Sequence, residues 1–319
     1  MPRSRSKLFR SRKFFGVALT LLLAFAFLPG LPAPARARVV AAAPAAQGQR
    51  GDPQVPVIAP GSAYRQTNLI SDIPGLAPFL DPLLVNCWGI TVRGTSPFWI
   101  VNNGTSTTQL VRGDVGGAPV TLNPSPQTVT IPGGLPTGAV SNSTSDFQIT
   151  PPGGGTPAAS LFIFDSITGN ITAWNGAQGT TAKNVVSNPG HVYTGLAIGS
   201  NSGGNRLYAA DFANNHIDVF DGTFTPTTVT GGFLDPTVPA THHAFNIQNL
   251  GGSLYVTYAK IDPMTGESVD APGEGFVRKF STDGVKDTTF VSPNVNSGGV
   301  LDSPWGLVIA PSSFGIFGG

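Results

Sequence analysis

Cysteine and charge are both scarce in this sequence. The 319 residues include one cysteine, Cys87, so no disulfide can form within the chain, and a C-x-x-C metal knuckle or redox pair is excluded. Charged residues make up only 11%, and the helix formers Glu and Lys are rare, whereas Gly (41) and Pro (29) are abundant. This composition predicts short strands joined by many turns. Cys87 is expected as a small buried apolar side chain rather than a reactive thiol.

Signatures of the common enzyme classes are also missing. The chain contains no nucleophile elbow, P-loop, H-E-x-x-H motif or dinucleotide fingerprint. Its Gly-Gly pairs open no helical pattern, so we interpret them as hairpin turns rather than phosphate cradles. No catalytic residue can therefore be named from a motif.

The N-terminal 37 residues have the pattern of an export signal. Six basic residues within 3–13 precede an uncharged apolar run at 14–28, and an A-x-A cleavage site follows at 35–37. The run is shorter than the roughly 20 residues that span a bilayer, so a cleaved signal peptide (1–37) is favoured over a retained membrane anchor. A disordered linker is expected at 38–62. We expect an exported protein, periplasmic, cell-surface or extracellular, with no stable membrane span after cleavage.

Removal of the signal reverses the sign of the net charge. Residues 1–37 hold seven basic residues and no acidic ones, which leaves eleven Lys and Arg against 17 Asp and Glu. Such a chain has little from which to build a basic face. Nucleic acid is therefore not expected as a partner.

From residue 63 onward the sequence repeats loosely. An apolar anchor followed by Gly, Gln or Asn and an aliphatic residue recurs with spacings of 59, 48, 50 and 60 residues. The copies are Trp88-Gly89-Ile90, Phe147-Gln148-Ile149, Thr194-Gly195-Leu196, Phe245-Asn246-Ile247 and Trp305-Gly306-Leu307. Short strands repeated at this period are typical of β-propeller blades, whereas a β-helix has a period of about 20–25 residues and a β-sandwich repeats no anchor.

Two further strands are expected after most anchors. The second, a nearly continuous apolar run as in strands covered on both faces, is expected at 98–101, 161–164, 207–210 and 254–258. The third is expected at 109–111, 169–174, 216–222 and 275–280. In the strand expected at 216–222, Asp218 alternates with Ile217 and Val219, which indicates that one face of this strand is more exposed to solvent.

The fifth anchor is followed by no second or third strand. We therefore expect residues 63–319 to form an all-β propeller that is C-terminally truncated, an open arc of about four blades and the first strand of a fifth. The anchor aromatics Trp88, Phe147, Phe245 and Trp305 are expected at equivalent buried positions near the channel.

At these anchors the chain resembles NHL-type propellers, in which a G-x-I/V-x-x-F-D strand closes each unit. It is also similar to an uncharacterised family of bacterial exported six-bladed β-propellers, some of which carry PEP-CTERM tails. The similar stretches are 64–72, 85–90, 96–99 with 103–105, 245–249, 254–259 and 301–307. Members of that family usually have Pro immediately before the Trp-Gly pair. Pro304 occupies this position before Trp305-Gly306, whereas Cys87 occupies it before Trp88-Gly89. The resemblance implies an NHL-like fold and no particular activity.

Polar residues lie within three positions before each anchor: Asn86, Asp146, His191, His242, His243 and Asp302. Because the innermost strands of a propeller run along its channel, residues that enter them are expected at one channel mouth. Asn, Asp and His are suitable ligands for a divalent cation, so these six are the candidate metal collar. Turns favour the same residue types without any metal. A resemblance to gluconolactonase-type propellers would imply a metal that polarises a lactone carbonyl.

Two functions remain open. The first is an exported, non-catalytic propeller that binds a protein, glycan or cell-surface ligand. The second is a metal-dependent lactone or ester hydrolase, or a lyase, acting in the channel. Carboxylates that point into the channel would favour the second, and a lining of backbone and apolar groups would favour the first.

Overall fold

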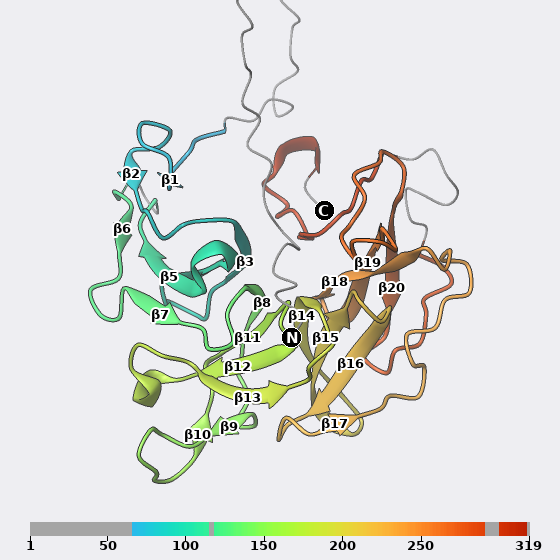
Figure 1. The fold of residues 1–319 in the computed structure, drawn as a ribbon, viewed down its shortest axis with the longest axis horizontal. Coiled ribbons are helices and arrows are strands. Elements are labelled where there is room, and N and C mark those ends of the chain that lie inside the picture. The colour runs from blue at the N-terminus through green and yellow to red at the C-terminus, as the bar shows by residue number, and fades with distance from the viewer. Residues whose placement is uncertain (1–65, 115–117, 291–299, 318–319) are drawn as a thin grey trace, which may run out of the picture.

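The computed structural model describes residues 66–114, 118–290 and 300–317 (Figure 1). The expected signal peptide at 1–37 and linker at 38–62 lie outside the described residues. The regular structure consists of strands and three short 3-10 turns at Asn103–Thr105, Gly176–Gln178 and Gly315–Phe317. No helix within the described ranges is long and apolar enough to cross a membrane.

Four antiparallel sheets make up most of the fold. The first contains β3 (Cys87–Thr91), β4 (Phe98–Asn102), β5 (Thr107–Arg112) and β6 (Thr121–Leu122), with β7 (Thr128–Thr130) also paired to β5. The second contains β8 (Pro136–Ser141), β11 (Phe162–Ser166), β12 (Asn170–Trp174) and β13 (Lys183–Ser187). The third contains β14 (Tyr193–Asn201), β15 (Gly204–Asp211), β16 (His216–Asp221) and β17 (Pro226–Thr227). The fourth contains β18 (His242–Leu250), β19 (Ser253–Lys260) and β20 (Gly275–Phe280).

Two short strand pairs lie beside these sheets. β1 (Ile70–Ser71) pairs in parallel with β2 (Phe79–Leu80), and β9 (Gln148–Ile149) pairs antiparallel with β10 (Ala158–Ala159). The second pair belongs to an excursion of the chain between β8 and β11, which are themselves neighbours in the second sheet.

The four sheets are arranged around a common centre in chain order, as the blades of a propeller are (Figure 1). The first strands, β3, β8, β14 and β18, are innermost, and each contacts the next along the chain. Later strands of each sheet step outward through hairpins. The turn between β18 and β19 is one example, with positive φ at both Gly251 and Gly252. The all-β propeller fold is therefore confirmed.

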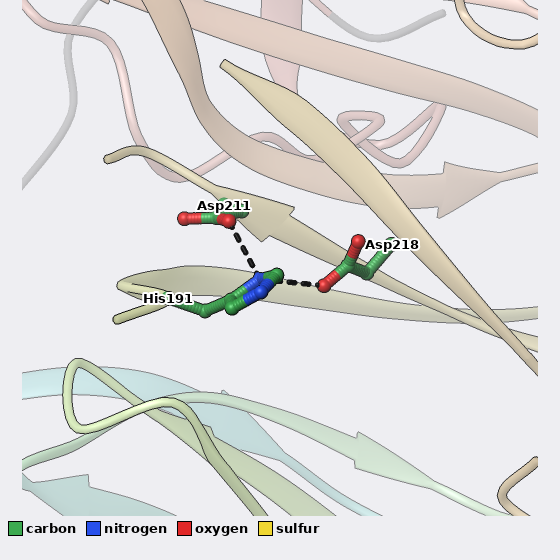
Figure 2. Close-up of side chains that lie close together, drawn as sticks. All are labelled: His191, Asp211 and Asp218. Carbon is green, nitrogen blue, oxygen red and sulfur yellow. Dashed lines mark ion pairs between the residues drawn. The ribbon is translucent and has the colours of Figure 1, made fainter. Parts of the chain in front are cut away.

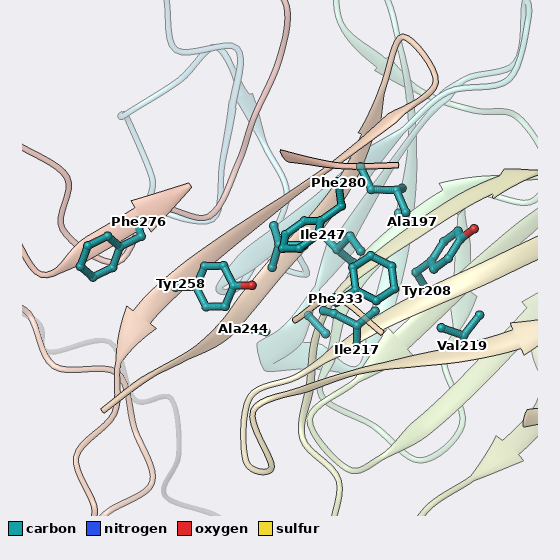
Figure 3. Close-up of a cluster of buried hydrophobic side chains, with 13 residues drawn as sticks. Ala197, Tyr208, Ile217, Val219, Phe233, Ala244, Ile247, Tyr258, Phe276 and Phe280 are labelled. Carbon is teal, nitrogen blue, oxygen red and sulfur yellow. The ribbon is translucent and has the colours of Figure 1, made fainter. Parts of the chain in front are cut away.

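Hydrophobic cores fill the spaces between neighbouring sheets. Trp99 and Phe164 pack between the first and second sheets, and Leu207 packs between the second and third. The largest core lies between the third and fourth sheets and contains Tyr208 and Phe280 (Figure 3). Every residue of β11 and β12 is buried, because these strands are covered on both faces. This burial explains the unbroken apolar runs in the sequence.

The expected second and third strands are confirmed. The second strands are β4, β11, β15 and β19, and the third strands are β5, β12, β16 and β20, each within a few residues of the expected bounds. The alternation in β16 is confirmed as well, since Ile217 and Val219 are buried and Asp218 is half-buried.

The expected second anchor, Phe147-Gln148-Ile149, is wrong. The innermost strand of the second sheet is β8, and its Thr137-Gly138-Ala139 segment holds the anchor position. Phe147 is buried, but it packs against Phe224, which follows β16 in the third sheet. The error arises because the excursion between β8 and β11 carries an apolar triplet that imitates the anchor.

The fifth anchor forms no strand within the described residues 300–317. This segment lies in the gap between the fourth and first sheets (Figure 1). Its Leu301 carbonyl oxygen accepts hydrogen bonds from Gly273 N (3.0 Å) and Gly275 N (3.1 Å) beside the fourth sheet.

The expectation of a buried Cys87 is also wrong, because this side chain is exposed. Ile90 (62% exposed) and Phe98 (39% exposed) lie on the same sheet. Residues within 67–70, which lead into β1, lie beside this apolar surface and line a pocket together with Cys87, Ile90 and Phe98. The four described sheets form an arc around the common centre (Figure 1).

Candidate functional site

A cavity of about 510 Å³ lies at the centre of the arc. The innermost strands of all four sheets and residues 305–308 form its wall, so five chain segments meet around it. The lining residues are 89–91, 138–141, 196–198, 246–249 and 305–308. None of them is an acidic, basic, histidine or cysteine residue, and their polar side chains are hydroxyls, amides and one indole.

Glycines bring the innermost strands into close contact. A Cβ at Gly89 would lie 2.6 Å from the backbone oxygen of Thr137 in β8. A Cβ at Gly138 would lie 2.6 Å from the backbone nitrogen of Leu196 in β14. A Cβ at Gly195 would collide with Asn246 of β18. Because backbone atoms cannot yield as a flexible side chain can, a larger residue would push neighbouring sheets apart. A Cβ at Gly306 would meet nothing within 4 Å.

An aromatic cluster lies where the channel-lining segments begin. The Trp305 ring is 5.4 Å from the Trp88 ring, and the Trp88 ring is 6.1 Å from the Phe245 ring, both in edge-on geometry. Trp305 Nε1 donates a hydrogen bond to Thr194 O (2.6 Å), and Asn246 Nδ2 donates one to Trp305 O. Trp305 thus contacts the first, third and fourth sheets.

Three of the four anchor aromatics meet near the channel, but the expectation that all are buried is wrong for two of them. Phe245 is buried, whereas Trp88 and Trp305 are half-buried. Phe147, the fourth, lies elsewhere, because the anchor of the second sheet is Thr137 rather than an aromatic residue.

A buried carboxyl group, Asp165 of β11, lies behind the channel wall. Its Oδ1 accepts hydrogen bonds from Thr137 Oγ1 (2.8 Å) and from Gly138 N, while its Oδ2 has no hydrogen-bond partner. Burial raises the pKa of Asp165 to about 6, although the bonds from Thr137 and Gly138 oppose this rise. Asp165 does not line the cavity, so its hydrogen bonds hold β8 in the cavity wall rather than contact a bound ligand.

A second polar group lies on the third sheet, away from the cavity lining. His191 precedes β14, Asp211 ends β15, and Asp218 lies within β16. His191 Nδ1 is 2.7 Å from Asp211 Oδ2 and 2.9 Å from Asp218 Oδ2 (Figure 2). The Asp211 side chain is fully buried, whereas those of His191 and Asp218 are 34% and 17% exposed.

The strand register explains why these residues meet. Asp211 pairs with Tyr193 of β14 on one side and with His216 of β16 on the other. Asp218 is two residues beyond His216 and therefore lies on the same face of the sheet. Three strands thus place their polar side chains over one patch.

Hydrogen bonds orient both carboxylates. Asp211 Oδ1 accepts from Val192 N (3.0 Å), and Asp211 Oδ2 accepts from Asn214 Nδ2 (2.6 Å). Asp218 Oδ2 accepts from the Tyr193 hydroxyl (2.5 Å), and Asp218 Oδ1 lies 2.9 Å from the His216 ring nitrogen.

The same contacts set the ionisation of Asp218. Burial opposes its charge, but hydrogen bonds from His216 and Tyr193 outweigh burial, so the pKa of Asp218 is lowered. The contact with Asp218 raises the pKa of His216, and burial together with Asp218 raises the pKa of Tyr193. Asp218 is therefore a stable carboxylate at neutral pH.

The six residues expected as a metal collar are not brought together. Within the described ranges, no hydrogen bond or ion pair joins any two of them. His191 is the member that meets other metal-ligating residue types, namely Asp211 and Asp218. The other five belong to separate networks.

Asp146 and His243 lie toward opposite ends of the third sheet. Asp146 Oδ2 accepts a hydrogen bond from Asn205 at the start of β15 (2.8 Å). His243 Nδ1 contacts Phe212 O just after the end of β15 (2.7 Å). Seven residues of extended chain separate these two contacts, roughly 23 Å at the rise of a strand.

Asn86, His242 and Asp302 are held by local contacts. Asn86 has positive φ, and its Nδ2 donates to Asn103 Oδ1 (3.2 Å). His242 is buried and lies 3.0 Å from a Glu274 carboxylate oxygen, with its pKa lowered chiefly by burial. Asp302 is exposed and accepts a hydrogen bond from the backbone of the loop before β20.

Sequence reasoning missed Asp211 and Asp218 as partners of His191. The sequence pattern that could have revealed this group is a β-hairpin: Asp211 ends one apolar strand, and His216 begins the next after a short turn. A four-residue connection would place Asp211 opposite His216 and on the same face as Asp218.

Two sequence relatives come from Acanthamoeba polyphaga mimivirus. Uncharacterized protein L690 is 32% identical over 264 residues, which cover 80% of this chain and 67% of L690. Uncharacterized protein R648 is 32% identical over 264 residues, which cover 80% of this chain and 62% of R648. The chain thus spans a little under two thirds of the length of R648 and about two thirds of L690. No protein-family model matches the sequence.

Among solved structures, a protein of unknown function from Bacteroides thetaiotaomicron VPI-5482 is similar with a TM-score of 0.39 and 14% identity. The alignment covers 66% of this chain and 44% of that protein. This likeness is too distant to carry a structural argument.

Proposed function

We propose that this chain, which belongs to the same family as the mimivirus protein L690, is an exported, non-catalytic β-propeller that binds a partner through its central channel. The partner is a protein, a glycan or another cell-surface ligand. The proposed export rests on the basic and apolar N-terminal pattern and the A-x-A site. Membership of the NHL-like bacterial exported family is part of the same proposal and rests on the anchor stretches.

The observation that carries the proposal is the lining of the cavity. A cavity of about 510 Å³ has the size of a ligand site, and its wall combines aliphatic side chains with a few hydroxyls and amides. These groups can accommodate an uncharged partner segment and form hydrogen bonds with it. They include neither a general acid or base nor a nucleophile with an adjacent base.

The alternative hydrolase would need a different channel. A metal that polarises a lactone carbonyl requires carboxylate, imidazole or thiolate ligands around an open coordination position. The described lining supplies only neutral oxygen and nitrogen groups. This difference favours the binding function over lactone or ester hydrolysis in the channel.

A charge placed in the channel tests the binding function. The wild-type chain and Ile198→Asp would be screened against a glycan array and a displayed peptide library, with a lactone and ester panel run in parallel. Ile198 lines the cavity and is half-buried, so a carboxylate there should weaken binding of an uncharged segment at least about tenfold. Met264→Asp is the control, because Met264 is 93% exposed and absent from the lining.

Binding lost in Ile198→Asp and retained in Met264→Asp would support the proposal. Binding that is equal in both variants would place the partner elsewhere on the surface. Hydrolysis of a lactone or ester that Ile198→Asp abolishes would contradict the non-catalytic assignment, and an absence of binding to both libraries would count against the proposed partners.

A further inference from the structure

We propose that His191, Asp211 and Asp218 form a binding site for one first-row divalent transition cation, with Zn²⁺ preferred. The site lies on the third sheet and shares no residue with the lining of the central cavity. The proposal is therefore independent of the binding function proposed for the channel.

Three ligand atoms already converge at this place. His191 Nδ1, Asp211 Oδ2 and Asp218 Oδ2 come from three separate chain segments, and suitable ligand atoms of the three residues all lie within 4.8 Å of one another. Tetrahedral Zn²⁺, with bonds of about 2.0–2.1 Å, separates adjacent ligand atoms by about 3.3 Å. The two nitrogen–oxygen separations, 2.7 and 2.9 Å, are close to that value. A small side-chain rotation would therefore admit the ion.

The ring nitrogen of His191 is the least satisfied atom of the group. It is buried and within 3 Å of two carboxylate oxygens, yet its direction makes a hydrogen bond with neither. Figure 2 shows Asp211 and Asp218 approaching this nitrogen from different sides. One proton on a planar ring can point to only one acceptor, whereas a cation between the three atoms can bind all of them.

The surroundings hold both carboxylates as they do in metal sites. Asp211 is anchored by Val192 N and Asn214 Nδ2, and Asp218 is anchored by the Tyr193 hydroxyl. Such hydrogen bonds from neighbouring groups fix the orientation of ligating carboxylates. The two negative charges would be balanced by a divalent cation.

The ligand types select the class of metal. One imidazole and two carboxylates suit Zn²⁺ and its first-row neighbours, whereas Ca²⁺ takes six to eight oxygen ligands. Three protein ligands also leave a fourth position open. His216 is not part of this cluster of ligand atoms; its Nδ1 lies 2.9 Å from Asp218 Oδ1, the carboxylate oxygen that does not face His191.

Metal titration of the full chain tests the site. Protein freed of metal with a chelator would be titrated with Zn²⁺ by calorimetry and with Co²⁺ by visible absorption, and Ca²⁺ would be added as a competitor. We expect one Zn²⁺ per chain, a rise in Tm with Zn²⁺, and no displacement by Ca²⁺. His191→Ala should raise the Kd for Zn²⁺ at least tenfold and abolish the tetrahedral Co²⁺ band.

Matched variants separate the site from other histidines and from misfolding. His243→Gln should bind Zn²⁺ as the wild type does, because His243 contacts a backbone oxygen outside the cluster. Asp218→Asn, in which the amide keeps most of the packing, repeats the test if His191→Ala unfolds. An ion-pair cluster without a metal would show no Zn²⁺ binding in the wild type, which overturns the proposal. Unchanged binding in His191→Ala or Asp218→Asn, or equal competition by Ca²⁺, would also overturn it.

Discussion

At the scale of single residues, the surroundings of two carboxyl groups decide at which pH each of them ionises. Asp165 is fully enclosed in β11, whereas Asp218 is ionised on the third sheet by its contacts with His216 and Tyr193. The two carboxyl groups therefore have pKa values shifted in opposite directions. Burial outweighs the hydrogen bonds at Asp165, whereas at Asp218 burial is opposed and outweighed by the combined hydrogen bonds and neighbouring charges.

Asp165→Asn should change the pH dependence of stability. The pKa of this carboxyl is about 6 in the folded chain against an ordinary 3.8, so the folded state holds the proton more tightly than the unfolded state. The protonated Asp165 therefore contributes to the free energy of unfolding, and this contribution is fully present below pH 3.8 and is lost as the pH rises through 6. The stability of the wild type relative to Asp165→Asn should fall by about 2–3 kcal/mol across that window. Urea titrations of both proteins at pH values below 3.8 and above 6 would check this difference. Free energies of unfolding that change with pH in the same way in both proteins would contradict it.

At the scale of elements, the innermost strands hold the sheets in order. Each of Gly89, Gly138 and Gly195 faces the next innermost strand so closely that a Cβ would overlap it. None of these glycines has positive φ, so their role is steric. The repeated small residue after the anchor is therefore a requirement for packing between sheets.

Gly89→Ala and Gly306→Ala form a matched pair for testing this packing. Both glycines follow a tryptophan in a Trp-Gly anchor, but only the Cβ at Gly89 would overlap a neighbouring backbone. Gly89→Ala should lower the free energy of unfolding by about 1–3 kcal/mol, the usual cost of overpacking. Gly306→Ala should change it by less than about 0.5 kcal/mol. Equal effects in denaturant titrations would show that the anchors are not packed as described.

At the scale of the whole molecule, residues 300–317 connect the two ends of the arc. Trp305 contacts Trp88 of the first sheet and hydrogen-bonds to Thr194 of the third, and its backbone oxygen bonds to Asn246 of the fourth. These contacts link sheets that are far apart in sequence. The segment thus contributes to the fold without forming a strand.

Trp305→Ala should loosen the contact between the first and fourth sheets. A fully buried Trp→Ala change costs about 3–5 kcal/mol, so a half-buried Trp305 should contribute about 2 kcal/mol. The loss should also expose Trp88, which intrinsic fluorescence would record as a red shift. Trp305→Phe is the control, because it keeps an aromatic ring against Trp88. A wild-type melting curve and fluorescence spectrum for Trp305→Ala would mean that the segment does not hold the arc together.

Much of the fold could be predicted from sequence periodicity. The second and third strands were identifiable because strands covered on both faces are continuously apolar and half-covered strands alternate, as β11 and β16 show. The anchor of the second sheet was not identifiable in the same way. Thr137-Gly138-Ala139 contains no large apolar residue, whereas the peripheral Phe147 triplet imitates the pattern.

The sequence by itself determined the class of fold and the second and third strands of each sheet, because these depend on local propensity and on burial along one chain. Tertiary structure alone decided which side chains meet. His191 reaches Asp211 and Asp218 only through the register of three paired strands, and Trp305 reaches Trp88 only through the curvature of the arc. The hairpin register that aligns Asp211 with Asp218 is local, whereas the approach of His191 to both and the curvature of the arc depend on how separate segments pack, which spacing along the chain does not specify.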